Sequence, residues 1–383
     1  MNIKLQKNLR RDILRGHPWV YRDALKSPPD CETARLAKIS DNKGELGWGL
    51  YDPHSALALR VISLDKRPPN FDVYANRLNS AHQTRQAVRS AETTAYRLVN
   101  GEGDLLPGMI CDMYNDIAVL QFDGRGPGEF WDLDAVANWL LTHTECTTVV
   151  EKSRSGAERG MQLVAGTPCE NQVTIREHGL SFEVELAKGQ KTGFFLDQRE
   201  NRKYVANFTK GLSVLNLFSY TGGFSVAAGR GGATRVASVD SASGAIDMAN
   251  ANWVLNGLAP DTHEGTCADV FQYLEDTPAI WDVVIVDPPS MARSEKQKPQ
   301  AMTAYTKLFI QAAQLCPPGG HLVLSSCSSH IHFEDFFEII IQALSKSRRK
   351  GRYLRISGQG ADHPFPHACP EMRYLKFAHL LLD

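Results

Sequence analysis

The chain is 383 residues long, with 43% hydrophobic and 22% charged residues, and its 42 lysines and arginines nearly balance its 43 aspartates and glutamates. These values are typical of globular protein and exclude collagen-like, low-complexity and wholly disordered chains. At roughly 100–200 residues per domain, the length predicts two or three domains, each with its own core. A formal net charge of −1 argues against a uniformly basic nucleic-acid coat but leaves room for local basic patches.

The start of the chain and its cysteines favour a cytoplasmic protein. Residues 1–14 alternate charged and hydrophobic side chains, so we expect no signal peptide. No apolar run approaches the roughly 20 residues of a membrane span. The eight cysteines form no CxxC pair, which favours reduced thiols over a disulfide framework or a metal site. They are Cys31, Cys111, Cys146, Cys169, Cys267, Cys316, Cys327 and Cys369.

Short alternating segments separated by turns predict a strand-rich domain over residues 1–70. Strands are expected at 34–39, 46–51 and 56–62, before a stiff polar linker over 67–70. Residues 73–187 predict an α+β middle domain. Its expected elements are a long helix over 73–96, a glycine-rich turn over 100–104, strands over 109–113 and 117–122, a helix over 130–141 and a strand over 147–151.

Residues 190–383 predict an α/β domain, because short apolar strands alternate there with helices. The strands are expected at 214–218, 236–240, 283–287, 321–325 and 373–382, and the helices at 224–228, 243–255, 301–315 and 334–344. This rhythm is typical of a mostly parallel sheet with helices on both faces. The helix over 243–255 is expected to start late, because Ser243 and Gly244 are poor helix formers.

Ligands of such sheets bind beyond the carboxyl ends of the strands. After the first strand, the glycine pair of residues 219–224 lets a ligand approach the backbone, although its spacing is not GxGxxG. Asp240 ends the second strand and could accept hydrogen bonds from ribose hydroxyls, and Asp269 could receive an adenine amino group. Each aspartate could equally be a helix cap. Together they favour a nucleoside pocket without a phosphate cradle, which fits S-adenosylmethionine better than NAD or ATP.

The next two strand ends suggest where a substrate would react. Asp287-Pro288-Pro289-Ser290 predicts a rigid, extended ledge, since two prolines fix φ and remove two donors. Ser290 stands where enzymes that methylate exocyclic amines usually carry an aromatic residue, which weighs against amine methylation. Cys327 ends the following strand. Its thiolate could attack an electron-poor ring carbon, whereas a buried cysteine elsewhere is often inert.

Seven motifs in order resemble those of the RlmI-like class I S-adenosylmethionine-dependent rRNA methyltransferases, which modify C5 of cytosine in large-subunit rRNA. They are RGHPWVY at 15–21, LVNGEGD at 98–104, GQKTGFFLDQRENR at 189–202, NLFSYTGG at 216–223, DPPS at 287–290, SCS at 326–328 and DHP at 362–364. The resemblance runs nearly end to end. It implies a Rossmann-like domain with a mostly parallel seven-stranded sheet, preceded by a small β-barrel PUA domain and an α+β middle domain.

The resemblance also implies a set of site residues. Cys327 and Asp287 would be catalytic, and Pro288 and Pro289 would contact the base. S-adenosylmethionine would be held by Gln198, Phe218, Ser219, Tyr220, Thr221, Gly222, Asp240, Ser241, Asp269 and Asp287. The RNA would be contacted by Arg10, Arg11, Arg15 and Trp19 of the PUA-like segment.

The implied chemistry is covalent, because cytosine C5 is a poor nucleophile. A Cys327 thiolate would add to C6, C5 would take the methyl group, a base would remove the C5 proton, and the thiol would be eliminated. Asp287 would contact the base edge near N3 and the amino group. The residues do not identify the proton-removing base; His330 is a candidate, although a solvent-facing or capping role is favoured.

Basic residues gather in two segments of the chain. Seven basic residues in the first 26 favour ribosomal RNA as partner, whereas a second cluster over 346–355 also suits a solvated helix end. Two other functions stay open: an amine or small-molecule methyltransferase with the same cofactor pocket, and a non-catalytic RNA-binding or assembly protein. Relatives in this family are often dimeric, but no apolar stripe in the sequence specifies a homodimer, and the oligomeric state stays open.

Overall fold

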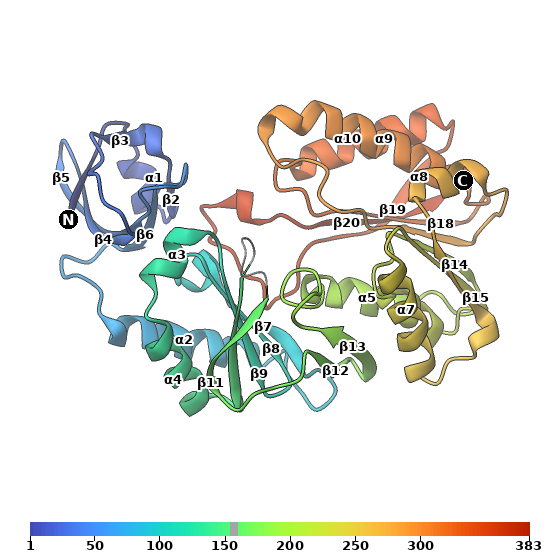
Figure 1. Cartoon of the computed structure of the whole chain (residues 1–383). Coiled ribbons are helices and arrows are strands. Elements are labelled where there is room, and N and C mark those ends of the chain that lie inside the picture. The colour runs from blue at the N-terminus through green and yellow to red at the C-terminus, as the bar shows by residue number, and fades with distance from the viewer. Residues whose placement is uncertain (154–159) are drawn as a thin grey trace. The chain divides into compact units, whose positions relative to one another are not determined.

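The computed structural model describes residues 1–153 and 160–383, and it separates into two compact units (Figure 1). Unit 1 comprises Met1–Ile175, Val184–Leu196 and Ala361–Met372. Unit 2 comprises Arg176–Glu183, Asp197–Gly360 and Arg373–Asp383. A tail segment thus belongs to unit 1, although the strands on either side of it lie in unit 2. The division into 1–70, 73–187 and 190–383 stays a prediction.

The first sheet of unit 1 has six strands in the order β2-β6-β5-β4-β1-β3. Alternate side chains on its strands, such as Ile3 with Leu5 and Ala37 with Ile39, are buried, which explains the alternating sequence. All its pairs are antiparallel except β1 with β4. The elements are β1 (Asn2–Leu5), α1 (Arg10–Leu14), β2 (Trp19–Val20), β3 (Leu25–Lys26), β4 (Arg35–Asp41), β5 (Gly44–Tyr51) and β6 (Leu59–Ser63).

The second sheet of unit 1 has five strands in the order β11-β10-β9-β8-β7. The strands predicted over 109–113 and 117–122 are confirmed as β8 and β9, with Asn115 between them at a φ of +57°. The elements are α2 (Phe71–Arg85), β7 (Ala95–Asn100), β8 (Met109–Tyr114), β9 (Ile117–Phe122), α3 (Arg125–Phe130), α4 (Leu133–His143), β10 (Thr148–Lys152) and β11 (Met161–Gly166). A two-stranded sheet follows, of β12 (Gln172–Glu177) and β13 (Leu180–Glu185).

The helix predicted over 73–96 is wrong at its C-terminal end. α2 ends at Arg85, a β-bridge joins Ser90 to Thr93, and the chain then enters β7. Arg85 is buried and donates two hydrogen bonds of 2.6 Å to the carboxylate of Asp104. This contact, made outside the helix, fixes where α2 stops and overrides the helical composition that follows it.

A buried ionic network ties the tail segment to the second sheet of unit 1. Arg97 donates to both carboxylate oxygens of Asp112, at 2.8 and 2.9 Å, and both side chains are at most 9% exposed. Asp362 of the tail accepts from the backbone N–H of Arg97 at 3.0 Å, and its carbonyl accepts from Arg85 at 3.0 Å. The Asp362-His363-Pro364 motif is therefore a structural clamp within unit 1.

Unit 2 is built on seven strands in the order β16-β15-β14-β17-β18-β20-β19, parallel as far as β18 and antiparallel beyond it. This confirms the predicted mostly parallel sheet of a Rossmann-like fold. Figure 1 shows α9 and α10 on one face of the sheet and α5 and α7 on the other. The strands are β14 (Ser213–Leu217), β15 (Arg235–Asp240), β16 (His263–Cys267), β17 (Val283–Val286), β18 (His321–Ser326), β19 (Gly351–Ser357) and β20 (Lys376–Leu382).

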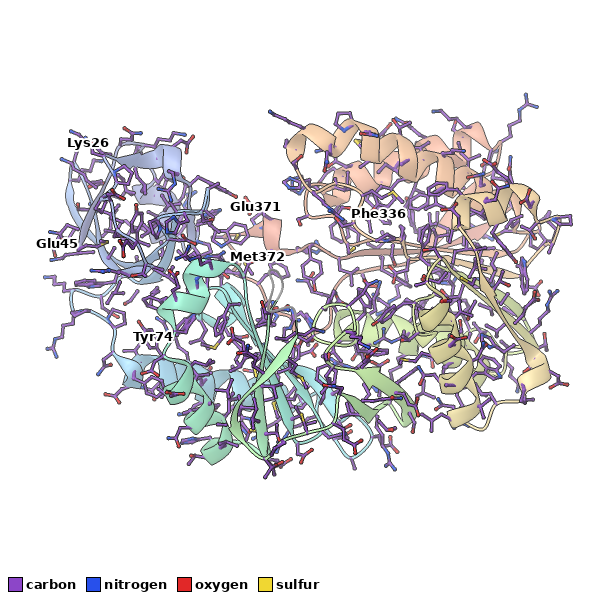
Figure 2. All side chains as sticks on the ribbon, viewed as in Figure 1. Lys26, Glu45, Tyr74, Phe336, Glu371 and Met372 are labelled. Atoms are coloured by element: carbon purple, nitrogen blue, oxygen red, sulfur yellow. The ribbon has the colours of Figure 1, made fainter. Side chains whose placement is uncertain are left out.

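The helices of unit 2 cover a sheet whose central strands are largely apolar and buried, as in Val283–Val286 of β17. Phe336 of α10 is 0% exposed and packs into this core (Figure 2). The helices are α5 (Arg199–Ala206), α6 (Gly223–Arg230), α7 (Ser243–Leu255), α8 (Val270–Asp276), α9 (Lys298–Gln314) and α10 (Phe333–Lys346). The expected late start of one helix is wrong, because α7 begins at Ser243. A Cβ on Gly244 would meet nothing within 4 Å, so this glycine adds only a propensity cost.

Among the described residues, no helix is both long and apolar enough to span a bilayer.

A buried histidine pair should make unit 2 sensitive to acid. His379 is 1% exposed, and its two ring nitrogens lie 2.9 Å from the Tyr204 hydroxyl and 2.8 Å from His321 Nδ1. Burial, with a smaller contribution from His321, lowers the pKa of His379 to about 3. The unfolded side chain titrates near pH 6.5, so the unfolded state binds the proton first and stability should fall as pH drops from about 6.5 towards 3.

Urea denaturation at pH 7.5, 6 and 5 measures this loss. Each pKa unit corresponds to about 1.4 kcal/mol, so a fall of about 2 kcal/mol is expected between pH 6.5 and pH 5. His379→Phe keeps the ring that stacks on Phe208 at 4.3 Å but cannot titrate. Its stability should depend less steeply on pH, and a slope equal to the parent's would contradict the assignment.

Candidate active site

The turn after β14 adopts a conformation that few residues favour. Phe218, Tyr220 and Gly222 have φ values of +58°, +47° and +79°. Two side-chain-bearing residues in the left-handed region each cost of order 1–3 kcal/mol, and such strain concentrates at functional sites. A Cβ on Gly222 would lie 2.9 Å from the Cβ of Ala249 in α7, so glycine is required by space as well as by φ. The turn therefore brings its backbone close to α7 at the start of α6, whose first residues are themselves buried.

Asp240 holds this turn from the end of β15. Its carboxylate accepts from the backbone N–H of Tyr220 at 2.9 Å and of Ala242 at 3.0 Å, while the side chain stays half-buried. Among the described residues, the buried hydroxyls of Ser219 and Thr221 have no hydrogen-bond partner. Buried polar atoms without a partner are uncommon and invite a ligand. A fixed carboxylate beside two such hydroxyls fits the sugar of S-adenosylmethionine.

Two other predicted cofactor residues lie at neighbouring strand ends. Ser241 directly follows β15 and is exposed. Asp269 is also exposed and caps α8, where its Oδ1 accepts from Gln272 N at 3.1 Å. The structure thus shows the helix-cap role of Asp269, and its contact with adenine stays a prediction.

Asp287 leaves β17 on the other side of β14, where the strand order reverses. Gln198, which is 2% exposed, donates to Asp287 Oδ1 at 3.0 Å. Asn201 in turn donates to Gln198 Oε1 at 2.6 Å and fixes its amide. The next residue, Pro288, is buried and Pro289 is exposed. The GQKTGFFLDQRENR motif at 189–202 therefore supplies the residues that orient the carboxylate at the start of the proline ledge.

Cys327 follows β18 and faces this ledge. It is half-buried, and its Sγ lies 3.8 Å from the carbonyl oxygen of Pro288. The adjacent Ser328 hydroxyl accepts from Met291 N at 3.0 Å and lies 3.0 Å from the Tyr305 hydroxyl. Ser290 also donates to Ser328, at 3.2 Å. The cysteine loop and the proline ledge are thus one hydrogen-bonded structure.

Lys376 is a site residue that the sequence analysis missed. It begins β20, is 1% exposed, and donates to the carbonyls of Ser328 at 2.6 Å and Tyr374 at 2.7 Å. Burial lowers its pKa to about 8, and nearby Cys327 opposes that shift. The available signal was a lone lysine among the apolar residues of a predicted strand.

The predicted RNA-contact residues lie in unit 1. Arg10 is bound to Asp41 by two hydrogen bonds of 2.7 Å, which hold the pKa of that carboxyl at about 2. Trp19 donates its indole N–H to Glu102 at 2.8 Å and is half-buried. Arg11 and Arg15 are exposed. In unit 2, the His330 imidazole lies 3.4 Å from Glu295, at the protein surface.

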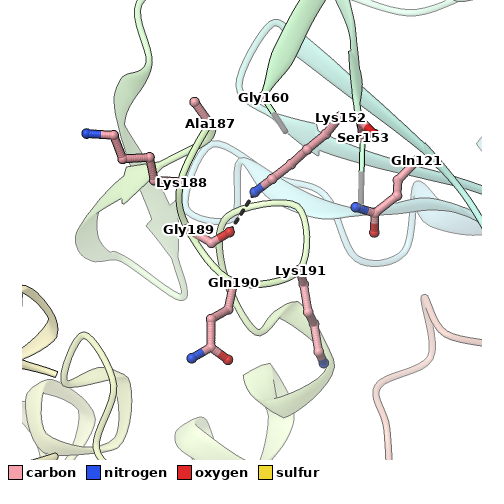
Figure 3. Close-up of a pocket in the computed structure, with 9 residues that line it drawn as sticks. All are labelled: Gln121, Lys152, Ser153, Gly160, Ala187, Lys188, Gly189, Gln190 and Lys191. Atoms are coloured by element: carbon pink, nitrogen blue, oxygen red, sulfur yellow. Dashed lines mark hydrogen bonds between the residues drawn. The ribbon is translucent and has the colours of Figure 1, made fainter. Parts of the chain in front are cut away.

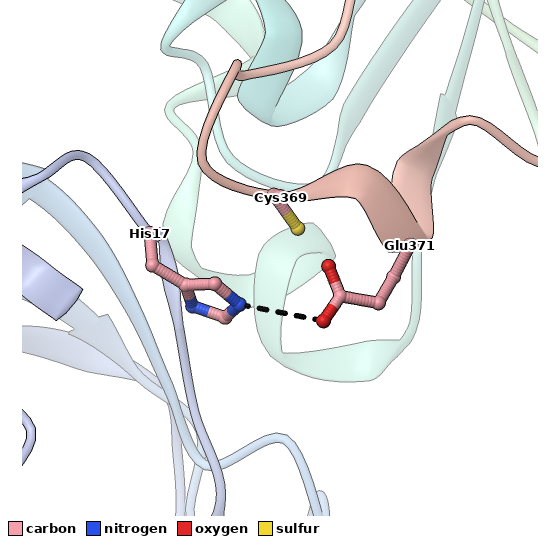
Figure 4. Close-up of side chains that lie close together, drawn as sticks. All are labelled: His17, Cys369 and Glu371. Atoms are coloured by element: carbon pink, nitrogen blue, oxygen red, sulfur yellow. Dashed lines mark ion pairs between the residues drawn. The ribbon is translucent and has the colours of Figure 1, made fainter.

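Two further features of unit 1 were not predicted. A cavity of about 590 Å³ is lined by three lysines and no carboxylate among the described residues (Figure 3), and Lys152 donates across it to Gly189 O at 2.6 Å. His17, Cys369 and Glu371 lie close together (Figure 4). Burial, reinforced by Glu371, raises the pKa of Cys369 to about 12. A protonated thiol is a poor metal ligand.

Comparison with known proteins agrees with this architecture. Residues 130–342 match the model of the S-adenosylmethionine-dependent methyltransferases, and residues 3–64 match that of PUA-like domains. The ribosomal RNA large subunit methyltransferase of Deinococcus radiodurans is 37% identical, over 100% of this chain and 98% of that protein. Ribosomal RNA large subunit methyltransferase I of Photobacterium profundum is 35% identical, over 98% of both chains.

Solved structures agree as well. One from Streptococcus mutans, described as an S-adenosylmethionine-dependent methyltransferase, superposes with a TM-score of 0.88 at 25% identity and full coverage of both chains. A methyltransferase structure complexed with SAH superposes with a TM-score of 0.89, also at 25% identity and full coverage. The family model covers more than half of the chain, and the curated relatives match it over nearly its full length. The chain therefore belongs to the S-adenosylmethionine-dependent methyltransferases and, within them, to the family of ribosomal RNA large subunit methyltransferases.

Proposed function

We propose that this protein transfers a methyl group from S-adenosylmethionine to C5 of a cytosine in large-subunit ribosomal RNA, through a covalent adduct with Cys327. One observation carries the proposal. A half-buried cysteine sulfur lies at the end of β18 beside the ledge that begins with Asp287, at the end of the neighbouring strand β17. The names of the relatives supply the ribosomal RNA. A pyrimidine ring placed on the ledge would have the sulfur and the carboxylate at its edge.

The chemistry needs a nucleophile and an oriented carboxylate. The Cys327 thiolate adds to C6 of cytosine, and the electron pair of the C5–C6 double bond becomes available at C5. S-adenosylmethionine, when bound, supplies an electrophilic methyl group. After C5 is methylated, its proton is lost, the C5–C6 double bond reforms, and the thiolate leaves C6. Asp287, held by Gln198, contacts N3 and the amino group and stabilises the charge that develops there.

Binding of the cofactor should depend strongly on Asp240. Asp240→Asn removes a charged acceptor for ribose hydroxyls and leaves one amide oxygen for the two backbone donors that the carboxylate now satisfies. Affinity for S-adenosylmethionine, measured by calorimetry, should fall about 10- to 100-fold. The exposed Asp261, changed to asparagine, is the control and should bind normally. An unchanged affinity for Asp240→Asn would contradict the pocket.

The exposed arginines near the start of unit 1 are the proposed RNA contacts. Arg10 is already neutralised by Asp41, so Arg11 and Arg15 are the better phosphate ligands. Binding through phosphates releases counterions, so RNA affinity should weaken steeply with added salt.

Mapping of modified nucleosides tests the proposal. Ribosomal RNA from cells with and without the protein is digested and analysed by mass spectrometry, and modified positions are located by bisulfite sequencing. We expect one 5-methylcytidine to disappear without the protein and to return with the purified enzyme. Loss of an N-methylated nucleoside instead would favour an amine methyltransferase, and no change in the RNA would overturn the proposal.

A further inference from the structure

We propose that the buried Lys376 ammonium is a positioning residue that keeps Cys327 ionised as a thiolate, ready for attack. This inference rests on the proposed covalent role of Cys327. Cysteine nucleophiles are commonly activated by a neighbouring histidine or a helix N-terminus. Here the cation comes from the last strand of the sheet, a part of the chain that the proposed chemistry has not otherwise used.

The sheet register brings Lys376 to the cysteine loop. β20 runs antiparallel to β18, and Lys376 is the direct partner of Ser326, the residue before Cys327. Its Nζ donates to the carbonyl of Ser328, the residue after Cys327, and to that of Tyr374. The lysine therefore spans the segment that carries the sulfur and is held there by two short hydrogen bonds. Its 1% exposure keeps water away from the ammonium.

The charges around Lys376 leave the sulfur as its natural counter-ion. Within the described part of the chain, no carboxylate forms an ion pair with Lys376. Cys327 and, less strongly, Asp335 on α10 raise the pKa of Lys376 against the effect of burial. Asp335 itself is bound to Lys298 at 2.8 Å and to His332 N at 2.9 Å. The Tyr305 hydroxyl of α9 also lies near the cysteine, and burial raises its pKa to about 12, so it stays neutral.

A buried ammonium without an anion is costly, and so is a buried thiolate without a cation. Ionisation of Cys327 next to Lys376 removes both costs. The Sγ–H proton goes to solvent, and the resulting ammonium–thiolate pair has no net charge. The same cation stabilises the thiolate again when it leaves C6 at the end of the reaction. An opposite charge within about 4–6 Å typically lowers a pKa by 1–3 units.

The test is the pH dependence of alkylation at Cys327, measured with iodoacetamide on the full chain and read by mass spectrometry of the peptide that carries it. Lys376→Gln keeps a donor for the Ser328 carbonyl but removes the charge, and Lys376→Arg keeps the charge. Lys152→Gln is the matched control. Lys152 is also a buried lysine that donates to a carbonyl and has a pKa lowered to about 8, but its charged neighbour is Glu185.

We expect Lys376→Gln to raise the alkylation midpoint and to slow alkylation at neutral pH by about tenfold or more. Lys376→Arg should restore most of the rate, and Lys152→Gln should leave it unchanged. A purely structural role would give Lys376→Gln the parent profile, which would overturn the inference. If that variant does not fold, the parent alone decides: its Cys327 midpoint must lie below the ordinary thiol value of about 8.5, and a midpoint at or above it overturns the inference.

The result can be separated from the fate of the proposed function. If the alkylation midpoint of Cys327 is low but no 5-methylcytidine is formed, the ion pair of Lys376 with Cys327 is supported and the proposed RNA methylation is refuted. If the protein methylates cytosine but Lys376→Gln leaves the alkylation midpoint of Cys327 unchanged, the proposed function stands and the role of Lys376 is refuted.

Discussion

Replacing Cys327 with alanine should lower methyl transfer by roughly 10⁴-fold or more, because the covalent step then has no nucleophile. Affinity for S-adenosylmethionine should stay within about twofold of the parent, since the cofactor turn lies after β14 and β15 while the sulfur follows β18. The sulfur is half-buried and lies 3.8 Å from the carbonyl oxygen of Pro288, and alanine is smaller than cysteine, so the fold should tolerate the change. Filter-binding with labelled cofactor measures transfer, and calorimetry measures binding.

Cys316 supplies the control for this experiment. It is 2% exposed, precedes the same strand, and burial raises its pKa to about 12. Cys316→Ala should retain methyl transfer although it removes a thiol near the same element. Full methylation by Cys327→Ala would falsify the covalent role, whatever the control shows.

Replacing Asp112 with alanine should cost unit 1 about 3–5 kcal/mol of unfolding free energy. The change removes the buried carboxylate that accepts two hydrogen bonds from the Arg97 guanidinium and one from the Thr192 hydroxyl. Urea denaturation followed by fluorescence measures the loss. Asp112→Ala should leave the Cys327 alkylation rate of the folded protein unchanged, because Asp112 belongs to unit 1 and Cys327 to unit 2.

An exposed ion pair shows whether burial causes the loss. Arg235 and Glu264 lie 3.3 Å apart with side chains 56% and 61% exposed. Glu264→Ala should cost no more than about 1 kcal/mol. Equal costs for the two variants would contradict the importance of the buried network.

The order of strand-end residues was predictable because parallel strands present their carboxyl ends at one edge. Asp240, Asp287 and Cys327 each follow an apolar run in the sequence, and the structure places each at or just after the end of β15, β17 or β18. The glycine turn was also predictable from its paired glycines, and the structure adds that a Cβ on Gly222 would lie 2.9 Å from the Cβ of Ala249 in α7. Roles that these residues play towards cofactor and base remain proposals.

Features set by contacts distant in sequence could not be predicted. The end of α2 depends on the pairing of Arg85 with Asp104, and the tail motif acts by accepting from Arg97, 265 positions away along the chain. Strand β19 was missed because it is an edge strand, and its Arg352 and Arg355 fall in the basic cluster that also suits a solvated helix end. The sequence analysis placed Lys376 only within a predicted strand, because the sequence does not show that this strand pairs with β18 next to Cys327.

The most direct test of the covalent mechanism uses RNA in which the target cytosine carries fluorine at C5. Fluorine takes the place of the proton that must leave, so the adduct at C6 cannot eliminate the thiol once C5 is methylated. With S-adenosylmethionine present, the parent protein should form a denaturant-stable complex with this RNA, and peptide mass spectrometry should locate the bond at Cys327. No stable complex from an enzyme that methylates the unmodified RNA, or a bond at another residue, would contradict the account.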